Sequence, residues 1–159
     1  MEGLAEGRFD GAPPDLVHAG SGFRIWFVQP LGLITQVGHQ ARVGEDVARF
    51  LSGEGQAELD RRRVGSERFT YLHDWRRLDG YSPASRKIMT DWGLRVGRDT
   101  ERIVIALRTQ AKVVRMGVSV ATMAMGLAGF QIEMVESLDE TITALELRHA
   151  PRRDSLRPG

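Results

Sequence analysis

The sequence predicts an α/β fold, with helices packed against a mixed sheet. Strand-like and helix-like segments alternate from about Arg68 to Leu147. Short runs rich in β-branched and aromatic residues, each followed by a longer stretch with helical spacing, are typical of βαβ units. The chain has 159 residues, a length that suits one domain with its own core. We expect a single domain with a sheet of four or five strands and about four helices.

The N-terminal part is predicted to form an arm followed by a hairpin. Residues 1–20 contain two prolines and show little periodicity, which indicates a flexible N-terminal arm. Residues 23–29 and 33–37 have the composition of strands. Pro30 and Gly32 lie between them, so we expect the two strands to pair as a hairpin.

A helix is predicted next. Val43, Val47, Phe50 and Leu51 have the spacing of an apolar face on an amphipathic helix. The helix is expected to continue past two glycines to the arginine run 61–63. Cations are favoured at a helix C-terminus, so this run is interpreted as a solvated helix end rather than a binding patch.

The second half continues the alternation. A strand is predicted at 68–75, and the helix after it has a clear start, with Ser82 as N-cap and Pro83 at the first helical position. The buried side of that helix is expected to carry Ile88, Met89, Trp92 and Val96. The remaining predicted elements are a strand at 102–107, a helix at 111–126, a strand at 130–135 and a helix at 138–147 capped by Ser137. The α/β domain is expected to span 21–148, followed by a flexible basic tail at 149–159.

Composition argues against several classes of function. A formal net charge of +1 gives no electrostatic case for a nucleic-acid partner. The chain has no cysteine, which removes disulfides and thiolate metal sites. The uncharged stretch 116–130 is shorter than the roughly 20 residues of a membrane span. The first residues lack the apolar core of a secretory signal, so a cytoplasmic protein without a membrane span is expected.

Catalytic and metal-binding patterns are also missing from the sequence. The four histidines do not have metal-ligand spacing, and no serine lies in a Gly-x-Ser-x-Gly motif. His73 and Asp74 form a histidine–aspartate pair, but at the end of a predicted strand. We therefore expect a protein that is not an enzyme and that has no cofactor and no metal.

The most distinctive segment runs from Asp74 to Arg86, where a strand ends and a helix begins. Ligands collect at such places in α/β sheets, and the free amides of a helix N-terminus favour anions. Gly80 is expected to supply a backbone conformation that a side chain would hinder. A capped turn with solvated arginines is the alternative. The predicted binding residues are Arg76, Arg77, Asp79, Gly80, Tyr81 and Arg86, and the predicted regulatory residues are Ser82 and Ser85.

The order of these elements resembles a known family. Asp74, the segment 78–83 (Leu-Asp-Gly-Tyr-Ser-Pro), the strand 103–107, the segment 112–119 (Lys-Val-Val-Arg-Met-Gly-Val-Ser) and a final strand and helix resemble the SpoIIAA-like (STAS-like) bacterial proteins. These are related in fold to the anti-sigma-factor antagonists and to the lipid-binding lobe of the Sec14 group. The resemblance implies a mixed sheet flanked by helices and frequent dimers.

The resemblance also bears on regulation. The antagonists carry a phosphorylatable serine in an Asp-Ser-Ser-Gly-type motif at the start of the helix after the central strand. This chain has Ser82-Pro83-Ala84-Ser85 there, without that motif. Ser82 and Ser85 therefore lie near the position of the antagonists' phosphorylatable serine, but they are not part of the same motif.

Two functions follow as hypotheses. The first is a cytoplasmic protein-interaction module with a regulatory role, expected to form a homodimer through 116–130 or through the first hairpin. Trp26 and Phe27 point to opposite faces of one strand, so helices on one side only would leave one of them exposed. The alternative is a carrier or sensor of a small apolar or anionic ligand beside the Gly80 loop and the 111–126 helix. An open apolar cavity would favour the carrier.

Overall fold

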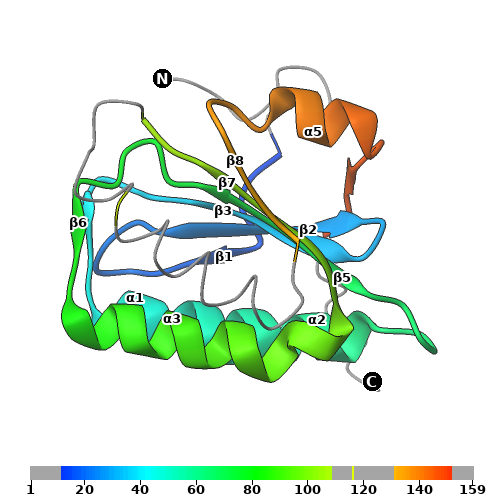
Figure 1. The fold of residues 1–159 in the computed structure, drawn as a ribbon, viewed down its shortest axis with the longest axis horizontal. Helices are drawn as coiled ribbons and strands as arrows, with labels where there is room; N and C mark the ends of the chain where they lie inside the picture. Colours follow the sequence, from blue (N-terminus) through cyan, green and yellow to red (C-terminus); the bar gives the residue numbers. More distant parts are fainter. Residues whose placement is uncertain (1–11, 109–115, 117–130, 152–159) are drawn as a thin grey trace, which may run out of the picture.

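The computed structural model describes residues 12–108, 116 and 131–151. These residues build a seven-stranded sheet in the order β1-β2-β3-β5-β7-β8, with β9 also paired to β2 (Figure 1). The strands are β1 (Leu16–Val17), β2 (Arg24–Gln29), β3 (Gly32–Gln36), β5 (Phe69–Asp74), β7 (Thr100–Ala106), β8 (Ile132–Val135) and β9 (Arg148–His149). A second, two-stranded sheet pairs β4 (Arg42–Val43) with β6 (Gly80–Tyr81).

The main sheet is mixed, as predicted. β2 and β3 pair antiparallel as the expected hairpin, whereas β3, β5, β7 and β8 are parallel neighbours. The five longer strands agree with the predicted number. β1 and β9 are additional strands of two residues each on the outer side of β2, too short to leave a periodic pattern in the sequence.

Three helical stretches accompany the sheet in the described part of the chain. The first joins α1 (Glu45–Phe50), a π-helical turn η1 (Leu51–Gly55) and α2 (Gln56–Arg62), so the predicted continuation past the glycines is confirmed. The others are α3 (Pro83–Val96), which ends in the 3-10 turn η2 (Gly97–Asp99), and α5 (Asp139–Ala144). The predicted helix at 111–126 lies outside the described residues, except for Met116.

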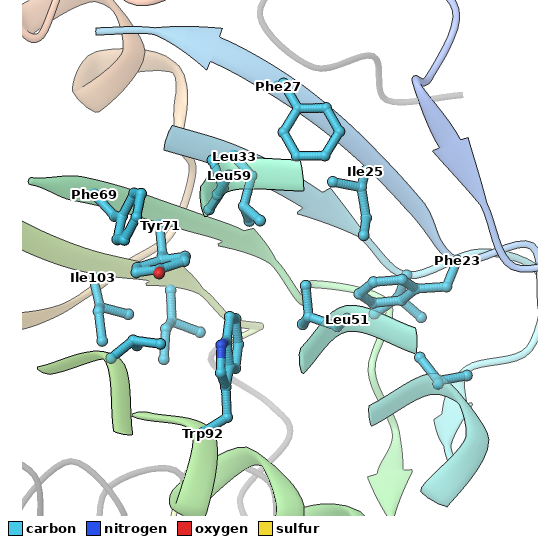
Figure 2. Close-up of a cluster of buried hydrophobic side chains, with 14 of the residues drawn as sticks. Phe23, Ile25, Phe27, Leu33, Leu51, Leu59, Phe69, Tyr71, Trp92 and Ile103 are labelled. Atoms are coloured by element: carbon cyan, nitrogen blue, oxygen red, sulfur yellow. The ribbon is translucent and has the colours of Figure 1, made fainter. Parts of the chain in front are cut away.

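The helices cover both faces of the sheet. In Figure 1, α1, α2 and α3 lie along one face and α5 lies on the other. The larger core, part of which Figure 2 shows, packs Phe27, Leu33 and Tyr71 of the sheet against Leu51 and Trp92. Gly55 allows the close approach of the first helical stretch, because an added Cβ would lie 3.2 Å from Ile25 Cδ1.

The second core corrects an expectation about exposed aromatic residues. Trp26 packs on the α5 face with Leu138 and Ile142, and it is only 5% exposed. Phe27 is fully buried on the opposite face. The expectation that one side of the first hairpin exposes an aromatic residue was wrong, because α5 covers that face. The hairpin therefore gives no support for a dimer.

The two terminal strands lie one after the other along the outer edge of β2. β1 pairs with Arg24 and Ile25, and β9 pairs with Val28 and Gln29. Part of the expected N-terminal arm and the first residue of the expected tail thus belong to the sheet. None of the described helices combines the length and apolar character that a membrane crossing needs.

The arginine run at the end of α2 is largely packed against the domain. The Arg62 guanidinium lies 4.5 Å from the centre of the Phe27 ring and bonds Glu58, while Arg63 pairs with Asp99 at 2.9 Å. Burial alone would raise the pKa of Glu58, but hydrogen bonds from Arg61 and Arg62 hold that pKa below its ordinary value. The expectation of a solvated run holds for Arg61 and was wrong for Arg62 and Arg63.

Candidate functional site

The loop after β5 is tied to the segment before α1. The amide of Asp79 donates to the carbonyl of Ala41 and the amide of Ser82 donates to the carbonyl of Val43. The parallel pairing of β4 with β6 lies between these two bonds. Backbone hydrogen bonds before and after β6 therefore hold the distinctive loop against the segment 41–43.

Arg76, one of the predicted binding residues, is engaged within the domain. Its Nε and Nη2 atoms donate to Oδ1 and Oδ2 of Asp74, each at 2.8 Å. The Asp74 side chain is 4% exposed and Gln36 Nε2 also reaches it, at 3.4 Å. This bidentate ion pair fixes the start of the loop.

The two candidate regulatory serines have structural roles. Ser82 is the predicted N-cap of α3, because its Oγ accepts a hydrogen bond from the amide of Ser85 at 3.0 Å. Ser85 is only 1% exposed, and its hydroxyl donates to the carbonyl of Ser82 at 2.8 Å and reaches that of Val43 at 3.2 Å. A phosphate on Ser85 would need the start of α3 to separate from β4, which argues against that serine as a modification site.

The other predicted site residues surround the same loop. Asp79 and Arg86 are exposed, Arg77 is half-buried, and none of the three forms an ion pair within the described part of the chain. Gly80 lies in β6 without a left-handed conformation, and the nearest atom to an added Cβ is 4.0 Å away. The expectation of a special backbone conformation at Gly80 was therefore wrong. Tyr81 is half-buried and packs against the larger core.

Beneath this loop lies an apolar cavity of about 100 Å³ between α1, α3 and the sheet. Three of the predicted site residues, Tyr81, Ser85 and Arg86, line it, while Arg76, Arg77, Asp79 and Gly80 do not. Its other walls come from the helices, from the neighbouring strands β5 and β7, from β4, and from residues just outside β2 and β5. They are Phe23, Val43, Val47, Ala48, Leu51, Tyr71, His73, Trp75, Leu78, Met89, Thr90, Trp92, Gly93, Val96, Ile103 and Ile105.

Aromatic rings form one side of the cavity. Tyr71, His73 and Trp75 alternate along β5 and its end, so they share one face and all line the cavity. The rings of His73 and Trp75 stack with centroids 4.9 Å apart. Trp92 of α3 meets Tyr71 edge-on at 5.2 Å, and Figure 2 shows the two rings close together between the sheet and the helix.

Most polar atoms of these rings have partners. Gln56 Oε1 accepts hydrogen bonds from the Tyr71 hydroxyl at 2.7 Å and from Trp92 Nε1 at 3.1 Å. His73 Nδ1 lies 2.8 Å from Thr35 Oγ1. Trp75 Nε1 is shielded from solvent and has no hydrogen-bond partner in the described structure.

The cavity carries no charge from its buried rings. Burial lowers the pKa of His73 to about 3, so the imidazole is neutral near pH 7. Burial also raises the pKa of Tyr71 above its ordinary value, which keeps the phenol protonated. The cavity interior is therefore suited to uncharged molecules.

The histidine–aspartate pair has no catalytic geometry. Successive strand residues point to opposite faces, so His73 faces the cavity while Asp74 faces away and bonds Arg76. In the described ranges, no group of three or more histidine or acidic side chains could hold a metal ion.

Sequence reasoning located the loop but missed the cavity. A sequence signal for the cavity wall was present in and just after β5, where aromatic residues alternate at Phe69, Tyr71, His73 and Trp75. An aromatic stripe of this kind marks a buried face, but the sequence does not reveal which positions of that face border empty space.

The fold is that of an α/β protein of SpoIIAA-like type. A similar solved structure is that of an uncharacterised protein of the DUF3478 family with a SpoIIAA-like fold from Shewanella loihica PV-4. The two chains are 16% identical with a TM-score of 0.54, and the match covers 85% of this chain and 99% of the other. No family model and no curated protein matches the sequence. The resemblance stated from the sequence is thus confirmed at the level of the fold.

Proposed function

We propose that this protein is a non-enzymatic carrier or sensor that holds a small apolar ligand in the cavity beneath the loop after β5. One observation carries the proposal: an unfilled, largely apolar space lies between α3 and the sheet and is lined by Tyr71, Trp75 and Trp92. Small-molecule sites are typically concave and apolar with few polar groups. Of the two functions expected from the sequence, this geometry favours the carrier or sensor.

The size of the cavity limits the ligand. An engineered apolar cavity of about 150 Å³ binds benzene, so a cavity of about 100 Å³ encloses at most part of a single-ring molecule. The rest of such a ligand would reach the mouth beside Tyr81 and Arg86. An anionic group is compatible with this position, because Arg86 is exposed and without an ion pair in the described part of the chain.

A titration with benzene tests the proposal. At ten times its dissociation constant, a ligand that binds only the folded state adds about 1.4 kcal/mol to the free energy of unfolding. Met89→Trp places a bulky indole ring at the cavity wall, where it should fill the space and abolish this gain. Leu94→Trp is the matched control, because Leu94 is 51% exposed on the same helix and does not line the cavity. If the Leu94 variant loses the gain equally, or wild type shows none, the proposal is wrong.

A second candidate is a protein-interaction module with a regulatory role, as expected from the resemblance. It is favoured by the charged side chains of Arg77 and Asp79, which form no ion pair with any described residue, beside the half-buried Tyr81 on a loop fixed by hydrogen bonds. With an identified protein partner, Arg77→Ala and Tyr81→Ala should weaken binding. Arg95→Ala, at an exposed position on α3, should not. Equal effects of all three changes would contradict this candidate.

The homodimer belongs to the same candidate. It can be checked by light scattering at micromolar concentration, where a monomer would contradict it. A cytoplasmic location also remains a prediction.

A further inference from the structure

The imidazole of His73 uses only one of its two nitrogens within the domain. Nδ1 lies 2.8 Å from Oγ1 of Thr35 on the neighbouring strand β3, whereas no described residue forms a hydrogen bond with Nε2. His73 is 3% exposed and lines the cavity. The cavity wall therefore contains a buried polar side chain with a free hydrogen-bonding position.

The free nitrogen points toward the cavity. Nε2 belongs to the end of the ring far from Cβ, and side chains of a strand stand roughly perpendicular to the sheet. It therefore points from β5 toward α1 and α3 (Figure 1), and the cavity lies between these helices and the sheet. In the described chain, the side-chain nitrogens that lack a partner and are sealed from solvent belong to Arg62, Arg63 and Trp75. His73 Nε2 is not one of them, so it borders open space, which inside the domain is the cavity.

From this geometry we infer that the ligand of the cavity is a small alcohol or phenol whose hydroxyl forms a hydrogen bond with His73 Nε2. The inference rests on the proposed carrier or sensor function and names the chemistry of its ligand. If Nδ1 donates to the Thr35 hydroxyl, Nε2 is an acceptor, and if the hydroxyl donates to Nδ1, Nε2 carries the proton and is a donor. A hydroxyl group suits both arrangements, because it can donate and accept.

The group that meets Nε2 is uncharged, because the cavity interior offers it no counter-charge. The buried His73 is neutral near pH 7, and the Asp74 carboxylate faces away from the cavity and bonds Arg76. A carboxylate or an ammonium group among apolar walls would lose its hydration without compensation. Arg86 lies at the mouth and is exposed, so it can attract only a group that remains outside.

Binding of phenol and toluene to wild type and to two variants tests the inference. The two probes are nearly equal in shape, but only phenol has a hydroxyl. His73→Phe keeps an aromatic ring without Nε2, so it should lower the ratio of the phenol affinity to the toluene affinity by about 3- to 10-fold, the effect of one neutral hydrogen bond. Thr90→Val is the matched control and should leave the ratio unchanged. Thr90 also lines the cavity, but its hydroxyl already donates to the carbonyl of Arg86.

A spectroscopic measurement on the wild-type protein does not depend on the variants. In a long-range ¹H–¹⁵N spectrum, each imidazole nitrogen has its own signal. Phenol should shift the His73 Nε2 signal much further than toluene does, because only phenol can form the hydrogen bond. The chain has three other histidines, and none of them lines the cavity. Their signals serve as internal controls.

The outcomes separate the inference from the function on which it rests. A His73 Nε2 signal that does not move at saturating phenol overturns the hydroxyl and leaves the apolar-ligand function standing. An affinity ratio that is unchanged in His73→Phe, or that falls equally in Thr90→Val, has the same consequence. If phenol, toluene and benzene all fail to bind to wild type, both proposals fail.

Discussion

Arg76 turns back onto Asp74, two residues earlier, and binds both carboxylate oxygens at 2.8 Å. The pair lies at the end of β5, where the sequence suggested that Arg76 recognises a ligand. Its charge is instead used within the domain, because the Asp74 side chain is 4% exposed and needs a partner.

The first prediction concerns this pair. Arg76→Ala should lower the free energy of unfolding by about 3 kcal/mol, because it leaves a buried carboxylate without its charged partner. Arg77→Ala, at the next position and without an ion pair in the described structure, should change it by less than about 0.5 kcal/mol. Urea unfolding of the two variants measures the difference. Similar small effects would show that the Asp74–Arg76 pair is not needed for stability.

The second prediction separates the two serines at the start of α3. Ser85→Glu places a carboxylate at a position that is 1% exposed, so we expect a loss of at least about 3 kcal/mol. Ser82→Ala should cost about 1 kcal/mol through loss of the N-cap, whereas Ser82→Asp keeps a good cap and should be close to neutral. Thermal and urea unfolding provide the comparison. A stable Ser85→Glu protein would restore Ser85 as a regulatory candidate.

The third prediction tests the shared acceptor Gln56. Gln56→Met keeps a similar shape but leaves the Tyr71 hydroxyl and Trp92 Nε1 without their acceptor, which should cost about 2–4 kcal/mol. In a Tyr71→Phe background the same change should cost about 1–2 kcal/mol less, because one of the two donors is absent. A double-mutant cycle of unfolding free energies measures this coupling. Strictly additive effects would contradict the shared hydrogen bonds.

The fourth prediction is a pH dependence from His73. The pKa of its folded state is about 3, below the ordinary value of 6.5. Between these values the unfolded chain binds a proton that the folded chain does not, so stability falls as the pH falls. The slope contributed by one such proton is about 1.4 kcal/mol per pH unit.

His73→Phe should therefore flatten the loss of stability between pH 6 and pH 4. Thr35→Val is the control, because it removes the hydroxyl that contacts His73 but leaves the histidine buried, so the wild-type slope should remain. Urea unfolding at several pH values gives the slopes. Equal slopes in wild type and His73→Phe would mean that the folded protein takes up the proton as readily as the unfolded chain.

The fifth prediction concerns the terminal strands. The Asp15 carboxylate accepts a hydrogen bond from the Phe27 amide at 2.8 Å and lies 3.1 Å from His149 Nε2. Asp15→Ala should cost about 2 kcal/mol and speed hydrogen exchange at the Ala150 amide, which bonds Phe27. Asp46→Ala, at a side chain that is 68% exposed, should leave that exchange unchanged. Unaltered exchange in the Asp15 variant would show that β9 is held without it.

The local elements followed from local patterns. The strand–helix alternation, the hairpin at Pro30 and the Ser82 cap were all predicted, because residues close in sequence decide strand periodicity, turn formation and helix capping. The short strands β1 and β9 left no such pattern, since they exist only by pairing with β2.

The contents of the site were decided by contacts between distant segments. Gln56 accepts a hydrogen bond from Trp92 Nε1, although the two residues are 36 positions apart in the sequence. Trp75 Nε1, in contrast, has no acceptor in the described structure. Arg62 is covered by its contact with Phe27, and Trp26 is covered by α5. By itself, the sequence determined where the longer strands and the described helices lie and where the segment between β5 and α3 falls. Only the tertiary structure decided which polar groups are paired and where the cavity lies, because pairing and empty space depend on how separate segments pack together.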